Sequence, residues 1–148
     1  MALFQNAGEV TRSAVAQLEQ VKPANGYLTD LKAVYGPTDS VRDDAPRPYA
    51  LVRPASDRQG SRAARQAVRL REYEIEGVFS KAASEVDLAG FHVDVLRAFG
   101  IGQDLPERQF PGLLNEEGDE AEYRWAVKGE NTHSITIRLG VEYVQTYN

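Results

Sequence analysis

Residues 134–144 read SITIRLGVEYV, the clearest strand pattern in the chain. Apolar side chains occupy every second position: Ile135, Ile137, Leu139, Val141 and Tyr143. Polar residues and glycine fill the positions between them: Thr136, Arg138, Gly140 and Glu142. A period of two indicates a β-strand with one buried face, because successive side chains of a strand point to opposite sides. Just upstream, KGEN at 128–131 predicts a turn and YRWAV at 123–127 predicts another strand.

A long strand is predicted further upstream, in VRLREYEIEGVFS at 68–80. Its apolar residues share one face with Gly77: Tyr73, Ile75 and Phe79. Its acids take the other face, typical of a solvated sheet surface: Glu72, Glu74 and Glu76. Val68 and Leu70 have the opposite parity, which predicts a bulge or a change of face near Arg71. Two shorter strands are expected at 28–35 and in YALVR at 49–53.

Helical periodicity occurs twice. Residues 8–21 place apolar side chains at three- and four-residue steps, and Pro23 stops that helix. Residues 87–99, DLAGFHVDVLRAF, form a second apolar stripe that is followed by glycine. Between the first helix and the first strand, Asn25 and Gly26 give the backbone the freedom to turn the corner.

Breaker residues and a lack of periodicity predict loops elsewhere. The segment GPTDSVRDDAPRP at 36–48 is rich in such residues. Residues 54–67 show no strand pattern and are interpreted as a mobile loop, and 103–122 is interpreted as a loop with at most one helical turn.

The order of predicted elements is α-β-β-β-α-β-β, which indicates one α+β domain over residues 1–148. We expect a largely antiparallel or mixed sheet of four to five strands, with both helices packed on one face. A length of 148 residues suits one domain with a real core, and 42% hydrophobic and 26% charged residues are ordinary globular values. No apolar run approaches the length that spans a bilayer, so no membrane contact is expected.

Composition and motifs give no support for catalysis. The chain has no cysteine, which excludes disulfides and thiolate chemistry and fits a reducing cytoplasm. His92 and His133 have no partner at ligand spacing, so they are interpreted as a helix-flank and a turn residue and no metal is predicted. No serine sits in a nucleophile elbow, and GIGQDLP at 100–106 lacks the third glycine and the preceding strand of a dinucleotide loop. We therefore predict no catalytic residues, no cofactor and no enzyme.

Two charged segments are candidates for contacts with a partner or a neighbouring subunit. The first is a basic arm without acids: Arg58, Arg62, Arg65, Arg69 and Arg71. The second is an acidic loop: Glu116, Glu117, Asp119, Glu120 and Glu122. The basic arm also has a simpler interpretation, a solvated flexible arm. Copies that joined basic arm to acidic loop would make a heterologous contact, which closes into a ring when the rotation permits.

The whole order of pieces resembles the tail terminator (tail-completion) proteins of long-tailed bacteriophages, the family of the phage lambda minor tail protein U. The segments that carry this resemblance are QLEQVKPANGY at 17–27, GYLTDLKAVYG at 26–36, DDAPRPYALVR at 43–53, YEIEGVF at 73–79, DLAGFHVDVLRAF at 87–99 and HSITIRLGVEYVQTY at 133–147. The resemblance is one of pattern and order, and it extends over nearly the whole chain.

The resemblance implies a structural role in the virion. Such proteins are made in the host cytoplasm and form a six-membered ring, a homo-hexamer, on the head-proximal end of the tail tube. The ring stops polymerisation of the tube protein and docks to the connector or stopper protein of the head. DNA only passes through its lumen, and no functional residue is carried over from the family.

Three other functions remain open from the sequence. The first is a head-closure or head–tail joining protein of the phage neck, which is also a small ring-forming subunit. The second is a nucleic-acid-binding module that uses the basic arm, which the net charge of −5 disfavours. The third is an enzyme whose site has no recognisable motif.

Overall fold

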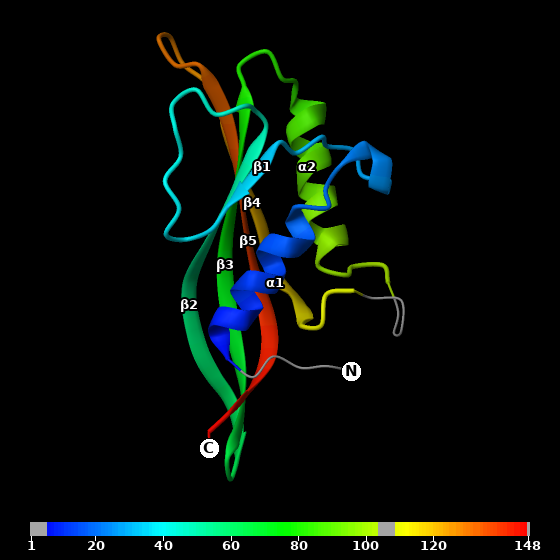
Figure 1. Cartoon of the computed structure of the whole chain (residues 1–148), viewed down its shortest axis with the longest axis vertical. Coiled ribbons are helices and arrows are strands. Elements are labelled where there is room, and N and C mark those ends of the chain that lie inside the picture. Colours follow the sequence, from blue (N-terminus) through cyan, green and yellow to red (C-terminus); the bar gives the residue numbers. More distant parts are fainter. Residues whose placement is uncertain (1–5, 104–108, 148) are drawn as a thin grey trace.

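The computed structural model describes residues 6–103 and 109–147, without the side chains of 116–118. Two helices lie on one face of a five-stranded sheet (Figure 1). In chain order the elements are α1 (Ala7–Leu18), a 3-10 turn (Pro23–Asn25), β1 (Ala33–Tyr35), β2 (Tyr49–Ala63), β3 (Gln66–Ser80), α2 (Glu85–Ala98), β4 (Leu113–Arg124) and β5 (Thr132–Thr146). This order and the α+β class confirm the prediction.

The sheet is mixed, with the strand order β1-β2-β3-β5-β4. Only β1 and β2 run parallel, and every other pair is antiparallel. The two long strands β3 and β5 are central to the sheet and pair without a register shift, from Gln66 with Thr146 to Ser80 with Thr132. The edges of the sheet are the three-residue strand β1 and the twelve-residue strand β4.

The core lies between the helices and the covered face of the sheet. The alternating apolar residues of β5 are all buried there, as expected: Ile135, Ile137, Leu139, Val141 and Tyr143. They belong to one cluster with Val10, Ala14 and Leu18 of α1 and Leu88, Phe91 and Val95 of α2. Gly77 allows the close approach of α2, because a Cβ atom at this position would lie 2.6 Å from Cε2 of Phe91.

Both helices begin at a capping residue. The Asn6 side chain accepts from the backbone N–H of Glu9, and Ser84 forms a capping box with Asp87. The second helix lies close to the predicted 87–99, but the first ends at Leu18 rather than at residue 21. Val21 is nevertheless buried, because its segment still packs on the core after the helix has ended. Because apolar spacing continues past the last helical residue, the sequence pattern predicted a first helix that extends beyond its actual end at Leu18.

The corner after α1 is held by α2 rather than by the sheet. The carboxylate of Asp94, which is 0% exposed, accepts from the backbone N–H of Leu28 at 3.1 Å and of Thr29 at 2.7 Å. Arg97 donates to the carbonyl of Gly26 at 3.0 Å, and Gly26 has a φ of 88°. Leu28 and Thr29 are bound to α2 in this way, and the N–H of Leu31 donates to the carbonyl of Val21, so β1 has only the last three of the eight residues that were predicted as a strand.

The prediction of a mobile loop at 54–67 is wrong. Residues 54–63 form the outer part of β2, Gln66 and Ala67 begin β3, and Figure 1 shows the β2–β3 hairpin reaching past α1. The register of β2 against β3 shifts between Pro54 and Ser56 and again between Gln59 and Arg62. Side chains on both faces of this outer part are largely exposed, so the apolar alternation that marks a strand in sequence is missing.

Two further predictions about strands are wrong. No bulge or change of face occurs in β3 near Arg71, because Val68 and Leu70 simply lie on the uncovered face of the sheet, and the irregularity is in β2 instead. The segment interpreted as a loop at 103–122 contains most of β4, which ends at Arg124 instead of running from 123 to 127. The register of β4 shifts between Asn115 and Glu120, which breaks the period of two.

Candidate interaction surfaces

The β2–β3 hairpin is braced by Asp57, which sequence reasoning missed. One oxygen of its carboxylate accepts from Nε of Arg69 at 2.6 Å. The other accepts from Nη1 of Arg71 at 3.1 Å and from the hydroxyl of Tyr143 at 2.6 Å. We call these four residues the Asp57 cluster. Because they come from β2, β3 and β5, the cluster ties three strands together where the hairpin leaves the core.

The Asp57 cluster also reaches the first helix. Arg71 donates from Nε to the hydroxyl of Tyr73 at 3.0 Å, and that hydroxyl shares a 2.8 Å hydrogen bond with Thr11 of α1. The Tyr73 ring is buried, so this polar chain runs along the edge of the apolar core. Buried hydroxyls and guanidinium groups that are satisfied in this way hold a single arrangement of the strands against the helix.

The environment of the cluster keeps Asp57 ionised. Burial alone would raise the pKa of the Asp57 carboxyl, but the hydrogen bonds from Tyr143, Arg69 and Arg71 outweigh it, so this pKa lies below its ordinary value. Burial and the hydrogen bond to Asp57 raise the pKa of the Tyr143 hydroxyl. The carboxylate is therefore charged and the tyrosine neutral at physiological pH, which is a bracing arrangement and offers no acid–base pair.

The structure divides the predicted basic arm into three parts. Arg69 and Arg71 are committed to Asp57, while Arg58 lies 3.7 Å from Glu72 on the uncovered face. Arg62 and Arg65 are exposed at the end of the hairpin, and neither has an ion pair with any described residue. We call Arg62 and Arg65 the hairpin tip. Within the basic arm as the structure describes it, only the tip keeps guanidinium groups without an ion pair, so it is the part that can contact a partner.

The predicted acidic loop lies in the edge strand β4. Asp119 contacts Nε2 of His92 on α2 at 3.0 Å. Glu120 and Glu122 both pair with Arg138, at 3.5 and 3.1 Å. Two carboxylates on one guanidinium leave one negative charge uncompensated, so β4 presents an acidic surface next to an open strand edge. The side chains of Glu116 and Glu117 lie outside the described residues.

The uncovered face of the sheet is polar, as predicted for the glutamates of β3. Glu72, Glu74 and Glu76 all lie on it, and Arg53 donates to Glu76 at 3.1 Å. In the ion pairs of Arg53 with Glu76 and of Arg58 with Glu72, at least one side chain is half exposed or more. These two pairs therefore contribute little to the free energy of unfolding.

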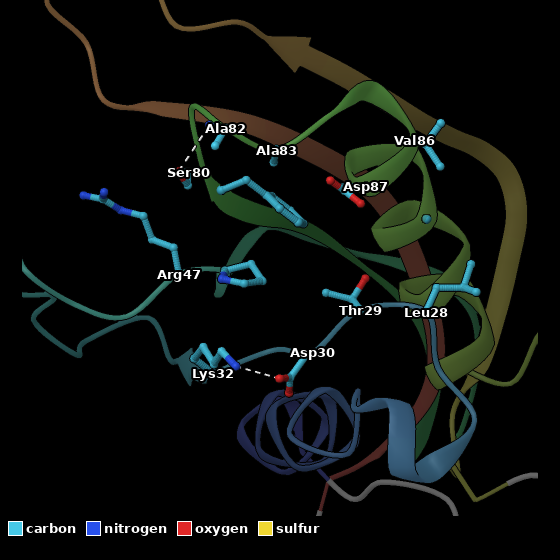
Figure 2. Close-up of a pocket in the computed structure, with 13 residues that line it drawn as sticks. Leu28, Thr29, Asp30, Lys32, Arg47, Ser80, Ala82, Ala83, Val86 and Asp87 are labelled. Carbon is cyan, nitrogen blue, oxygen red and sulfur yellow. Dashed lines mark hydrogen bonds and ion pairs between the residues drawn. The ribbon is translucent and has the colours of Figure 1, made fainter.

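A groove of about 580 Å³ lies between the corner segment, the beginning of α2 and the residues before β2 (Figure 2). Leu28 and Val86 both line it on the side of α2 and are 68% and 79% exposed. The lining includes the ion pair of Lys32 with Asp30, at 2.6 Å. The sequence had marked the corner only as a turn, and it gave no signal for a groove there.

A second exposed apolar feature, which we call the aromatic turn, occupies residues 123–131. The rings of Tyr123 and Trp125 stack with centroids 5.7 Å apart, and Trp125 meets the His133 ring edge-on at 5.1 Å. The Nδ1 atom of His133 accepts from the backbone N–H of Ala126 at 2.8 Å. His133 lies inside β5 rather than in a turn, which corrects the prediction, whereas His92 lies on α2 as expected.

Searches against protein-family models and against curated proteins found no match to this chain. Within the described ranges, no three His, Cys, Asp or Glu side chains are grouped so that they could hold a metal ion. None of the helices seen in the described part of the chain is long and apolar enough to cross a membrane.

Two residues that position these surfaces could have been found in the sequence with different reasoning. Asp57 is the acid directly before the arginine-rich segment, where it can serve as the counter-ion of arginines on the neighbouring strand. Asp94 lies three residues after Phe91 and one before Val95, on the apolar side of its helix. An acid at such a position indicates a buried carboxylate that binds backbone N–H groups.

Proposed function

We propose that this chain is a non-enzymatic assembly protein of a bacteriophage tail. In this proposal, copies of the chain form a six-membered ring on the head-proximal end of the tail tube. The ring stops growth of the tube and provides the surface to which the head connector or stopper protein docks. DNA passes through the lumen without being held. The protein would therefore be found in the virion, at the end of the tail next to the neck.

One observation carries the proposal: the element order α-β-β-β-α-β-β extends through the entire described chain as one domain. That is the order on which the resemblance to tail terminators rests. The surfaces give further support, since the subunit presents two unlike and oppositely charged features. The hairpin tip carries Arg62 and Arg65, and β4 carries Asp119, Glu120 and Glu122. Surfaces of this kind suit head-to-tail association of identical subunits.

The experiment for this proposal is a tube-growth assay. Tail tube protein from the same phage is allowed to polymerise with and without a substoichiometric amount of the purified chain, and tube lengths are measured. We expect the tubes to be shorter with the chain than without it. The number of shortened tubes should rise with the amount of chain added. Unchanged tube lengths at every ratio would contradict the role as a terminator. Binding to the head connector without any effect on tube growth would identify a head–tail joining protein instead.

A further inference from the structure

The groove and the aromatic turn lie at the same end of the molecule. The turn follows β4, and the loop after β3 forms part of the groove. A hydrogen bond of 3.0 Å joins the backbone N–H of Lys81 to the carbonyl of Asn131, which fixes the two features relative to each other. In Figure 1 the turn projects beyond the end of the sheet, away from α2. One copy therefore cannot fill its own groove with its own turn without breaking this arrangement.

The groove offers exposed apolar surface beside its charged residues. Leu28 and Val86 line the groove on the side of α2, and Ala82 and Ala83 line it from the loop after β3, next to Ser80 (Figure 2). Lys32, Asp30 and Asp87 already have partners within the chain. Lys32 is paired with Asp30, and the Asp87 carboxylate accepts from the N–H and hydroxyl of Ser84. Arg47 also lines the groove: it donates from Nη2 to the carbonyl of Asp43 at 3.3 Å, and its buried Nε has no hydrogen-bond partner among the described residues. An occupant that brings apolar side chains would gain the burial of exposed Leu and Val without displacing those hydrogen bonds.

The aromatic turn has the chemistry that such a groove fits. Trp125 is 42% exposed and Val127 is 66% exposed. The turn is also held in shape before any contact, because Glu130 accepts from Arg124 at 2.7 Å and from the backbone N–H of Val127 at 3.0 Å. A rigid turn that presents aromatic and branched side chains loses little conformational entropy on binding. Trp is also a residue type that dominates the energy of interfaces.

The charges beside the two features are complementary. Lys128 is exposed on the aromatic turn, directly after Val127. On the other feature, Val86 stands between Glu85 and Asp87 in the first turn of α2. If Val127 packs against Val86, the ammonium group of Lys128 comes close to these carboxylates. The contact is then attractive, although the chain as a whole carries a net charge of −5.

We propose that the aromatic turn of one copy enters the groove of a second copy. Trp125 and Val127 bind against Leu28 and Val86, with Lys128 beside Glu85. This contact uses two unlike surfaces of the chain, so it repeats from one copy to the next. The inference deepens the proposed ring and rests on it for the number of copies, but the contact itself can be tested without tail tubes.

A charge exchange tests the pairing of Lys128 with Glu85. Both side chains are exposed, so neither substitution disturbs the core. We expect Lys128→Glu to lower self-association, measured by sedimentation velocity over a range of concentrations, and the added Glu85→Lys to restore it. The matched control is Lys128→Glu with Glu19→Lys, at an exposed site at the end of α1, which has the same net charge but should not recover. If the two double variants self-associated to the same extent, the pairing of Lys128 with Glu85 would be overturned.

Cross-linking tests which surfaces meet, and the absence of cysteine from the chain makes it specific. A Trp125→Cys variant is mixed with a Val86→Cys variant at high concentration and oxidised mildly. The proposal predicts a disulfide-linked dimer of the two variants, well above the level formed when Trp125→Cys is mixed with Ala16→Cys, an exposed position on α1. A yield no higher than this control would overturn the contact. If the chain cross-links specifically but leaves tube growth unchanged, the contact is supported and the proposed function is contradicted. If the chain limits tube growth but does not cross-link above the control, the proposed function is supported and the contact is contradicted.

Discussion

Asp57 shows how a single carboxylate positions a whole hairpin. Two guanidinium groups and one hydroxyl converge on it, and its side chain is only 19% exposed. Removing the charge leaves Arg69 and Arg71 near each other without their counter-ion. We expect Asp57→Asn to lower the free energy of unfolding by roughly 1–3 kcal/mol at pH 7, measured by urea denaturation.

The pH dependence of this variant follows from the direction of the pKa shift. The pKa of Asp57 is lower in the folded protein than its ordinary value of 3.8. The carboxylate therefore stabilises the fold above that ordinary value, and its contribution is lost as the pH falls through the folded pKa. The difference in unfolding free energy between wild type and Asp57→Asn should be constant from pH 6 to 8 and shrink below about pH 4. A difference that does not change with pH would contradict the assignment.

Asp94 is the second residue whose loss should be costly. It is fully buried and accepts two backbone hydrogen bonds that fix Leu28 and Thr29. Asp94→Ala leaves both N–H groups without these acceptors, and we expect a loss of about 2–4 kcal/mol in the free energy of unfolding. Asp94→Asn keeps one acceptor and should fall between wild type and Asp94→Ala. If both variants unfolded like the wild type in urea, the corner would not depend on this carboxylate.

Gly77 and Gly90 form a matched pair of tests of packing. A Cβ atom at Gly77 would meet Phe91 at 2.6 Å, whereas at Gly90 the nearest atom, on Leu28, is 3.5 Å away. Gly77→Ala should therefore destabilise the protein by about 1–3 kcal/mol through overpacking. Gly90→Ala, in the middle of α2, should be neutral or stabilise it by up to about 1 kcal/mol. Melting temperatures that moved in the same direction for both would contradict this account.

At the scale of elements, the hairpin tip should affect association and leave stability unchanged. Arg62 and Arg65 are exposed and make no ion pair with the described residues. The double variant Arg62→Glu, Arg65→Glu should keep the melting temperature of the wild type within a degree or two and reduce oligomer mass in light scattering. The control with the same change of charge is Arg12→Glu, Arg42→Glu, on exposed sites away from the tip. Unchanged oligomer size in the tip variant would remove the tip from the interface.

Elements that are covered on one face could be predicted from the sequence. The apolar residues of the strand at 134–144 recur every second position, and those of the helix at 87–99 recur every three or four positions. Both patterns are clear because the core buries one side of each element and leaves the other in water. The outer hairpin and β4 could not be predicted in the same way. Backbone pairing holds those strands where side chains on both faces are exposed, or where a register shift interrupts the alternation.

The candidate surfaces were predicted only in part. The sequence identified the charged side chains, but not which of them are neutralised within the chain. Arg69 and Arg71 look the same in sequence as Arg62 and Arg65, and what separates them is the position of Asp57 across the hairpin. The groove depends on residues 28, 47 and 86 coming together, and this is a property of the tertiary structure alone.

In the proposed function, the chain caps one end of a tail tube as a ring of identical subunits. Identical acidic subunits repel one another at a distance, so local contacts between unlike surfaces must hold a ring together. A monomer in solution is compatible with this account if the tube acts as the template. Occupancy of the tube end is therefore a better test than oligomeric state.

The most direct measurement is electron microscopy of tail tubes mixed with the purified chain. The account predicts a ring of extra density on one end only of each tube. That density should weaken in the Arg62→Glu, Arg65→Glu variant and stay unchanged in the Arg12→Glu, Arg42→Glu control. Tubes with no added density at either end, at a chain concentration well above that of tube ends, would contradict the account.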